Sequence, residues 1–249
     1  MFVLFGKFLE ITGAGQFFIN LAVSGMGKYR GGPAKTAVVA SSLMGSISGS
    51  AVANTVTTGA ITIPLMKKTG YKNDFSGGVE AVSSTGGQIM PPIMGAAAFI
   101  ISSYIGLPYI QIAIAAIIPA ILYYVCIYFQ IDFRAQKDNL KGLPKEELPI
   151  MKKVLKEGYL YIIPLVVIIY MLVLGYSPMR AGLWGIVSIL IIALFLFLRN
   201  TQKSKQKLNI VNSAKSGFKK VWVGLDFGAR AIIETAIACA AAGIIIGIV

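Results

Sequence analysis

The stretch SLMGSISGSAVANTVTTGA, residues 42–60, contains four serines, three threonines and an asparagine but no charged residue. It is too polar for a helix that faces lipid, and it lacks the charges of an ordinary surface loop. The chain around it is more apolar, because 56% of its 249 residues are hydrophobic and only 13% are charged. Soluble domains carry about a quarter of their residues as charged side chains. The long apolar blocks therefore predict an all-α integral membrane protein.

The basic residues are concentrated in short stretches between the apolar blocks. The positive-inside rule, under which cytoplasmic loops are rich in lysine and arginine, explains the formal net charge of +13. We therefore expect a multi-pass protein of the cytoplasmic (inner) membrane that contacts lipid. A nucleic-acid partner is not expected. There is no histidine, and the two cysteines lie in separate apolar runs. Zinc, haem and histidine-based catalysis are unsupported, and we expect neither an enzyme nor a cofactor.

Three apolar runs are long enough to be predicted membrane spans: residues 107–133, 158–175 and 179–198. The loops at 134–157 and 199–220 are basic, so both are predicted on the cytoplasmic side.

Residues 33–68 have basic sequence on both flanks, so this segment should enter from the cytoplasm and return to it. Two full spans would satisfy this rule as well as a re-entrant hairpin would. The limbs at 33–47 and 51–66 decide between them, because each reaches only about 22–24 Å against a hydrocarbon core of about 30 Å. We predict a re-entrant helical hairpin with its turn at SISGS, because a polar turn suits a cavity lined by protein.

The next element, residues 75–103, should cross the membrane but contains SSTGGQIMPP at 83–92. The glycine pair is a poor helix interior, and the proline pair removes two backbone donors. We therefore predict a helix that breaks near mid-membrane and frees carbonyl oxygens.

The hairpin tip and the helix break form two uncharged polar clusters. Neutral oxygens suit a hard monovalent cation, and the N-termini of half-helices suit an anionic substrate. Close helix packing is the alternative, since GSISG matches the GxxxG pattern. We favour ion and substrate binding, because one cluster lies on a hairpin too short to span and the other at a double-proline break. The candidate binding residues are Ser46, Ser48, Gly49, Ser50, Asn54, Ser83, Ser84, Thr85, Gly86, Gly87, Pro91 and Pro92.

Three further features have simpler interpretations. Glu80 lies about one turn inside the broken helix, where it could mark a pathway. We favour a side chain that reaches the cytoplasmic interface near Lys67 or Lys68. Arg230 and Glu234 have the i,i+4 spacing of a local pair. In the segment 1–32, the amphipathic part could lie along the membrane surface through Phe17, Phe18, Leu21 and Met26, or could be an ordinary helix end.

Two segments together resemble the large membrane subunit of TRAP (tripartite ATP-independent periplasmic) transporters: RGGPAKTAVVASSLMGSISGSAVANTVTTGAITIPLMKKTGY at 30–71 and VEAVSSTGGQIMPPIMGAAAFI at 79–100. The chain is most similar to fused permeases, in which the small and large membrane subunits share one polypeptide. The resemblance runs from residue 1 to the end and is most specific between residues 31 and 100.

This resemblance implies a sodium-coupled importer of organic anions with an elevator mechanism. The partners implied are an extracytoplasmic substrate-binding protein, often of the TAXI type, and the remaining permease segments or a small membrane subunit. The hairpin tip with Asn54 is similar to the family's first hairpin, and 83–92 is similar to its partnering broken helix, where backbone oxygens largely hold sodium. Sodium is accordingly expected near Ser48, Ser50, Asn54, Ser84 and Thr85.

The family also has a second hairpin, related to the first by an inverted repeat. We expect this chain to be a central fragment that holds half of that arrangement. It divides into an arm (1–32), a transport-domain part (33–103), membrane helices with basic loops (104–220) and the truncated start of a second repeat (221–249). The alternative is a non-transporting structural fragment or subunit of a larger membrane complex. An intramembrane enzyme or a channel is disfavoured, since we find no nucleophile–base pair, charged ring or filter-like repeat.

Overall fold

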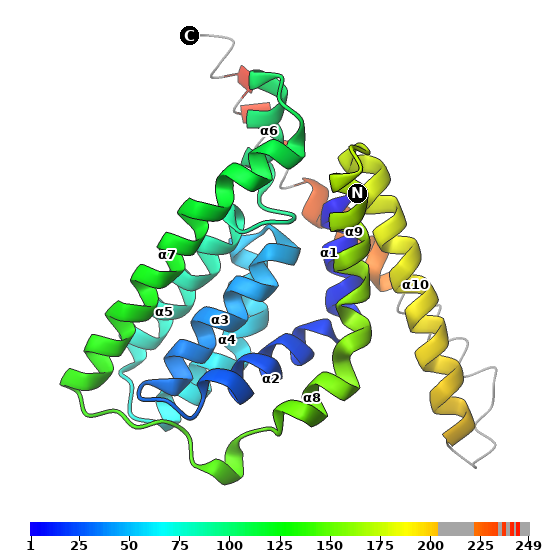
Figure 1. Ribbon diagram of the computed structural model, residues 1–249. Coiled ribbons are helices and arrows are strands. Elements are labelled where there is room, and N and C mark those ends of the chain that lie inside the picture. The colour runs from blue at the N-terminus through cyan, green and yellow to red at the C-terminus, as the bar shows by residue number, and fades with distance from the viewer. Residues whose placement is uncertain (204–221, 234–235, 238–239, 242, 245–249) are drawn as a thin grey trace. The chain divides into compact units, whose positions relative to one another are not determined.

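The computed structural model describes residues 1–203, 222–233, 236–237, 240–241 and 243–244. Within these residues the regular secondary structure is entirely helical, which confirms the predicted all-α fold (Figure 1). The chain divides into two compact units, Gly15–Tyr159 and a unit formed by Met1–Ala14 with Leu160–Val249.

The unit that contains the N-terminus is built from α1 (Phe2–Ile11), α9 (Ile163–Val173) and α10 (Pro178–Lys203). Helix α10 packs against both α1 and α9. The predicted span at 158–175 is divided here into a short 3-10 turn, η3 (Tyr159–Tyr161), and α9. Pro164 lies in the first turn of α9, a position where its missing N–H is not needed, so the helix begins afresh there.

The unit formed by residues 15–159 contains the hairpin and the helix break. Its elements are α2 (Ala14–Met26), α3 (Gly32–Ser48), α4 (Ala51–Lys68), α5 (Asn73–Gly86), η1 (Gly87–Ile89), α6 (Ala96–Ile105), α7 (Tyr109–Lys137), η2 (Lys145–Glu147) and α8 (Met151–Gly158). Helices α3, α4 and α5 all pack on one another, and α7 packs along α3 and α5 (Figure 1).

Helices α3 and α4 form a helical hairpin, joined by Gly49 and Ser50. Gly49 has a φ of +63°, a left-handed conformation that favours glycine and ends α3. The helices contain 17 and 18 residues and are therefore about 26 and 27 Å long. Both remain shorter than a hydrocarbon core of about 30 Å. The depth that the hairpin reaches in a membrane stays a prediction.

The predicted helix break lies between α5 and α6. Gly86 and Gly87 have helical φ values of −59° and −60°, but the α-helix ends at Gly86 and a 3-10 turn, η1, follows it. Helical structure stops at Met90, just before Pro91 and Pro92, and resumes at Ala96. The α-helix therefore ends at the glycine pair, and these glycines also serve close packing.

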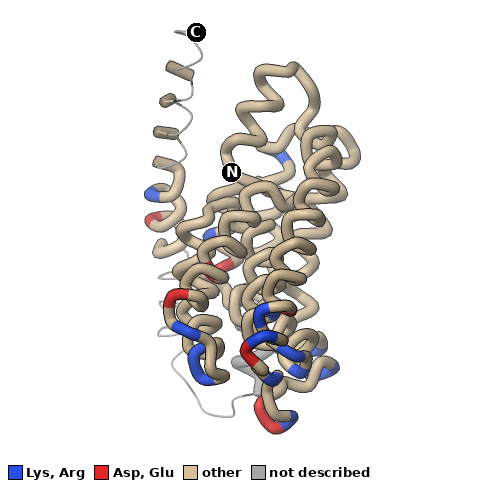
Figure 2. The backbone as a smooth tube through the Cα atoms, turned by 90° about the vertical axis from the view of Figure 1, so that its left-hand side faces the viewer, with Lys and Arg blue, Asp and Glu red and all other residues tan. Residues whose placement is uncertain are grey.

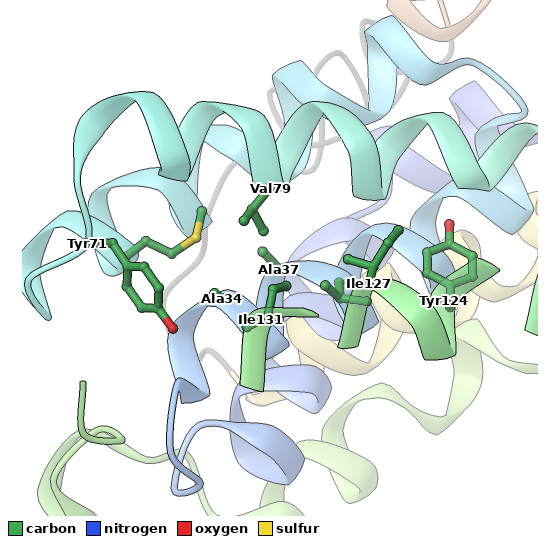
Figure 3. Close-up of a cluster of buried hydrophobic side chains, with 9 residues drawn as sticks. Ala34, Ala37, Tyr71, Val79, Tyr124, Ile127 and Ile131 are labelled. Carbon is green, nitrogen blue, oxygen red and sulfur yellow. The ribbon is translucent and has the colours of Figure 1, made fainter. Parts of the chain in front are cut away.

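Small residues on α3 allow α5 and α7 to approach it. Ala34 and Ala37 of α3 are completely buried and belong to one cluster with Val79 of α5 and Ile127 and Ile131 of α7. Figure 3 shows these side chains converging from the three helices. This apolar contact holds α3 and α5 in the alignment on which the polar residues further along them depend.

The amphipathic arm does not present its aromatic side chains to a membrane surface. Phe17 and Phe18 are only 6% and 4% exposed. A Cβ built on Gly158 of α8 would lie 1.9 Å from Cδ2 of Phe17, so the ring packs directly on that glycine. Ile19, Ala22 and Val23 cluster with Ala40 of α3. Helix α2 is therefore anchored to the hairpin through apolar contacts.

Two described helices are long and apolar enough to cross a membrane, namely α7 and residues Pro178–Phe195 of α10. Two further pairs of consecutive helices, α1 with α2 and Lys145–Tyr161 with α9, are long and apolar enough to cross a membrane if each bent pair is taken as one span. In the unit formed by residues 15–159, basic residues lie in the last turn of α4, at Lys67 and Lys68, and in the loops that join the helices. Figure 2 colours the lysines and arginines of the described residues blue. Lys68 at the end of α4 pairs with Glu147 at 2.7 Å.

Two sequence-based interpretations concern the C-terminal part of the chain. Arg230 pairs with Asp226 at 3.3 Å, whereas Glu234, its predicted partner, lies outside the described residues. Most of the basic loop at 199–220 also lies outside them.

Candidate functional site

The tip of the hairpin lies directly against the break between α5 and α6. The backbone N–H of Ile93 in the break donates to the carbonyl oxygen of Ser46 at 3.2 Å. A Cβ built on Gly49 would lie 2.2 Å from the carbonyl oxygen of Met94. The tip and the break, which are more than 40 residues apart in sequence, therefore touch through their backbones.

A second close approach occurs one turn deeper, where Gly45 of α3 crosses Gly87 of η1. A Cβ built on Gly45 would lie 2.4 Å from Cα of Gly87, and one built on Gly87 would lie 2.5 Å from Cα of Gly45. The Asn54 side chain lies beside this crossing, with Nδ2 3.1 Å from the Cβ position of Gly45. Gly45 and Gly87 thus bring Asn54 of α4 to the broken helix.

Four helix ends meet in this region. Helix α3 ends at Ser48 and α5 ends at Gly86, so their partly negative C-termini approach the crossing. Helix α4 begins after its N-cap Ser50, and α6 begins after its N-cap Gly95. The Cβ position of Gly95 is 3.4 Å from the carbonyl oxygen of Gly49, which places these two N-termini side by side. The site therefore has a face that favours cations next to one that favours anions.

Two buried side-chain oxygens at the site have no hydrogen-bond partner among the described residues. They are Oδ1 of Asn54 and Oγ of Ser83, whose residues are 1% and 0% exposed. The amide nitrogen of Asn54 donates to the carbonyl oxygen of Ser41 at 2.8 Å, which fixes the direction of the amide oxygen. Buried polar atoms ordinarily have partners, so these neutral oxygens fit a cation that accepts their lone pairs.

Other predicted site residues use their side chains locally. The hydroxyl groups of Ser46 and Thr85 donate to the carbonyl oxygens of Leu43 and Ala81 in their own helices, and Thr85 is exposed. Among the described residues, the Ser48 hydroxyl bonds to the backbone of Ser50, at 3.4 Å and 3.5 Å. At Ser46 it is the backbone that takes part in the contact between tip and break, since its carbonyl oxygen accepts the N–H of Ile93. Pro91 and Pro92 are half-buried in the break itself.

Tyrosines of α7 stabilise the broken helix, a role that sequence reasoning missed. The Tyr109 hydroxyl donates to the carbonyl oxygens of Pro92, at 3.0 Å, and Ile93. The hydroxyls of Tyr123 and Tyr124 donate to the carbonyl oxygens of Val82 and Ser83 at 2.8 Å and 3.0 Å. Both rings also pack on Gly86, whose Cβ would lie 2.3 Å from Cε1 of Tyr123. Tyr109 thus satisfies carbonyl groups of the break itself, whereas Tyr123 and Tyr124 tie the last turn of α5 to α7.

The interpretation of Glu80 as an interfacial side chain was wrong. Glu80 is 0% exposed and lies between α5 and the two limbs of the hairpin. Its carboxylate accepts hydrogen bonds from Ser41 at 2.9 Å, from Ser84 at 3.2 Å, and from Thr58 and Thr62. Lys68, one of the two lysines expected near it, pairs with Glu147 instead.

A signal in the sequence pointed to this buried cluster. Asn54, Thr58 and Thr62 recur every fourth residue, which places them on one face of α4. Glu80 and Ser84 have the same spacing on α5. Two polar stripes of this kind on neighbouring apolar helices predict a shared polar interface, although they do not show which atoms meet.

Ser50 caps the N-terminus of α4, and its replacement tests that local role. Its hydroxyl accepts the backbone N–H of Ala53 at 3.3 Å. We expect Ser50→Ala to lower the free energy of unfolding by about 1 kcal/mol. Ser42→Ala should have little effect, because that hydroxyl donates only to the Val39 carbonyl oxygen of its own helix. Denaturation midpoints of the two variants would show the difference, and equal midpoints would contradict the capping role.

These features define an α-helical, multi-pass membrane protein in which a helical hairpin meets a broken helix. The chain belongs to the family described as the tripartite ATP-independent periplasmic transporter DctM component, whose family model matches residues 1–249. It is thus a TRAP large permease protein of the inner membrane, as the motifs at the tip and the break predicted.

Curated relatives are consistent with this assignment. A putative TRAP transporter large permease protein of Haemophilus influenzae is 28% identical, over 79% of this chain and 46% of the relative. The sialic acid TRAP transporter large permease protein SiaM of Vibrio cholerae is 29% identical, over 73% and 42%. The C4-dicarboxylate TRAP transporter large permease protein DctM of Pseudomonas aeruginosa is 27% identical, over 79% and 46%. The chain spans less than half the length of these relatives.

Proposed function

We propose that this chain supplies the first hairpin and its broken helix to a sodium-coupled TRAP permease that imports organic carboxylate anions. An extracytoplasmic binding protein would deliver the anion, and the remaining permease segments or a small membrane subunit would complete the pathway. The role is transport, without a catalytic step. The observation that carries the proposal is the meeting of two helix C-termini and two helix N-termini beside the buried Asn54.

The cation would lie on the side of the C-termini. Oδ1 of Asn54 is the side-chain oxygen best suited to hold it, because it is buried and lacks another partner among the described residues. Backbone oxygens of the tip near Ser48 and Ser50, and of the α5 end near Ser84 and Thr85, would complete the coordination. Neutral oxygens suit sodium, since a divalent ion would favour several carboxylates.

The anion would lie on the side of the N-termini of α4 and α6. Backbone N–H groups and the positive ends of two helix dipoles favour a carboxylate there. The names of the relatives support this substrate class, since C4-dicarboxylates and sialic acid both carry carboxylate groups. Sodium bound close by would raise the affinity for the anion through its charge, which couples the two gradients.

Uptake into proteoliposomes tests the proposal. The complete permease, with this chain and its remaining segments, would be reconstituted together with its binding protein, and a labelled C4-dicarboxylate or sialic acid offered outside. We expect an inward sodium gradient to raise the initial uptake rate at least about tenfold over a choline gradient of equal ionic strength. Liposomes without binding protein are the control. Equal uptake in sodium and in choline would refute sodium coupling.

A further inference from the structure

The carboxyl group of Glu80 is buried and has no cationic partner among the described residues. Its polar neighbours are hydroxyl groups: Ser41 on α3, Thr58 and Thr62 on α4, and Ser84 on its own helix. Two lysines of the hairpin are engaged elsewhere, since Lys35 pairs with Asp132 at 2.5 Å and Lys68 with Glu147 at 2.7 Å, and the third, Lys67, is exposed. An ionised residue inside a membrane protein is costly and ordinarily has a partner.

The pocket around this carboxylate is shaped for it. Gly59 of α4 makes room for the Glu80 side chain, because a Cβ at that position would lie 3.0 Å from Cγ and 3.6 Å from Cδ of Glu80. Thr58 and Thr62 flank this glycine and bring their hydroxyls to the two carboxylate oxygens. The result is six side-chain oxygens from three helices in one buried place, two from Glu80 and one from each hydroxyl residue.

The threonine hydroxyls have too few hydrogens for their acceptors. Thr58 has one hydroxyl hydrogen, yet its oxygen lies 2.7 Å from the carbonyl oxygen of Asn54, 3.1 Å from Oγ of Ser41 and also in contact with Glu80. Thr62 likewise serves both the carbonyl oxygen of Thr58, at 3.0 Å, and Glu80. When both hydrogens turn to the helix carbonyls, lone pairs of the two threonines face the carboxylate and call for a cation between them.

We infer that Glu80 binds a sodium ion together with the hydroxyl oxygens of Ser41, Thr58, Thr62 and Ser84. This inference rests on the proposed function, to which it adds a second cation. The ion supplies the charge that the buried carboxylate lacks, and the threonine hydrogens then donate to the carbonyl oxygens of Asn54 and Thr58. Thr58 lies one helical turn from Asn54, so this site is about 6 Å further along α4 than the Asn54 oxygen.

The second ion has a mechanical consequence for the hairpin. Ser41, Thr58 and Glu80 come from α3, α4 and α5, so an ion among them ties both limbs of the hairpin to the broken helix. With the ion bound, these helices move as one body. Without it, the uncompensated charge weakens the packing of α5 on the hairpin.

Thermal unfolding of the complete permease in detergent at increasing sodium, with choline keeping the ionic strength constant, tests the inference. Near saturation each bound sodium raises the folding constant about tenfold for a tenfold rise in sodium. The loss of one site therefore predicts a tenfold smaller rise for Glu80→Gln, which keeps the size of the side chain, than for the wild type. The exposed-residue control Glu146→Gln should keep the rise of the wild type.

If the folding constant of Glu80→Gln rose with sodium concentration as steeply as that of the wild type, the inference would be overturned, whereas sodium binding at Asn54 would stand. No sodium dependence in the wild type would instead refute the proposed function itself. Thr62→Val provides a second variant should Glu80→Gln fail to fold, because it removes one oxygen and keeps the shape. Thr62→Val should need about tenfold more sodium to reach half of the stabilisation that the ion at the Glu80 site provides. An unchanged requirement in Thr62→Val would also count against the site.

Discussion

Replacing Gly45 with alanine is expected to reduce sodium-driven uptake at least about tenfold. The added Cβ would lie 2.4 Å from Cα of Gly87 and 3.1 Å from Nδ2 of Asn54. The first of these atoms is backbone, so η1 and α3 must separate for the methyl group to fit. That separation removes Asn54 from the broken helix and opens the contact between tip and break.

Helix propensity cannot account for a loss of uptake in Gly45→Ala, so such a loss would report on the contact between Gly45 and Gly87. Alanine is a better helix former than glycine by about 1 kcal/mol, so an effect on α3 alone would stabilise the protein. Gly78→Ala is the matched control, since a Cβ on this α5 glycine has nothing within 4 Å. We expect Gly78→Ala to retain wild-type uptake. Uptake of Gly45→Ala equal to that of Gly78→Ala would show that the crossing is not tight.

Replacing Asn54 with leucine is expected to raise the sodium concentration for half-maximal uptake at least about tenfold. Leucine has a similar size but removes the buried amide oxygen that lacks a partner among the described residues. It also removes the hydrogen bond from Nδ2 to the carbonyl oxygen of Ser41, which is 2.8 Å long. The expected change is in sodium affinity, because the lost oxygen is a proposed ligand.

Two comparisons separate this effect from simple destabilisation. Thr55→Val removes a hydroxyl on the same helix that donates to the carbonyl oxygen of Ala51 at 2.9 Å, and it should leave the sodium requirement unchanged. Asn54→Asp keeps an oxygen at the same place and should retain a stronger sodium response than Asn54→Leu. If sodium affinity were the same in Asn54→Leu and in the wild type, Asn54 would not be a ligand.

Much of the local architecture was predictable from the sequence. The predicted limbs at 33–47 and 51–66 correspond closely to α3 (Gly32–Ser48) and α4 (Ala51–Lys68). The signals there are local, because a glycine with positive φ ends one helix and a serine caps the next. The break before α6 was equally predictable, since Pro91 and Pro92 cannot donate backbone hydrogen bonds wherever they lie in the fold.

The partners of individual side chains were not predictable in this way. Glu80 reads as an interfacial acid from its position near the start of a span, but the structure buries it among hydroxyls from two other helices. Gly86 and Gly87 lie where the α-helix ends, but their contacts with Tyr123 and Gly45 could not be predicted from the sequence. Both outcomes depend on how α3, α4, α5 and α7 are rotated and spaced, and the pattern of neighbouring residues in the sequence does not specify this.

The sequence by itself determined that this is a membrane protein of the TRAP large-permease family, with an uncharged hairpin tip and a helix broken by two prolines. These properties follow from residue chemistry and from neighbours a few positions away. Only the tertiary structure decided that the tip touches the break, that Asn54 lies at a glycine crossing, and that Glu80 lies within a cage of hydroxyls. Those contacts join residues far apart in the chain, and they exist because apolar packing of α3, α5 and α7 sets the distance and rotation of the helices.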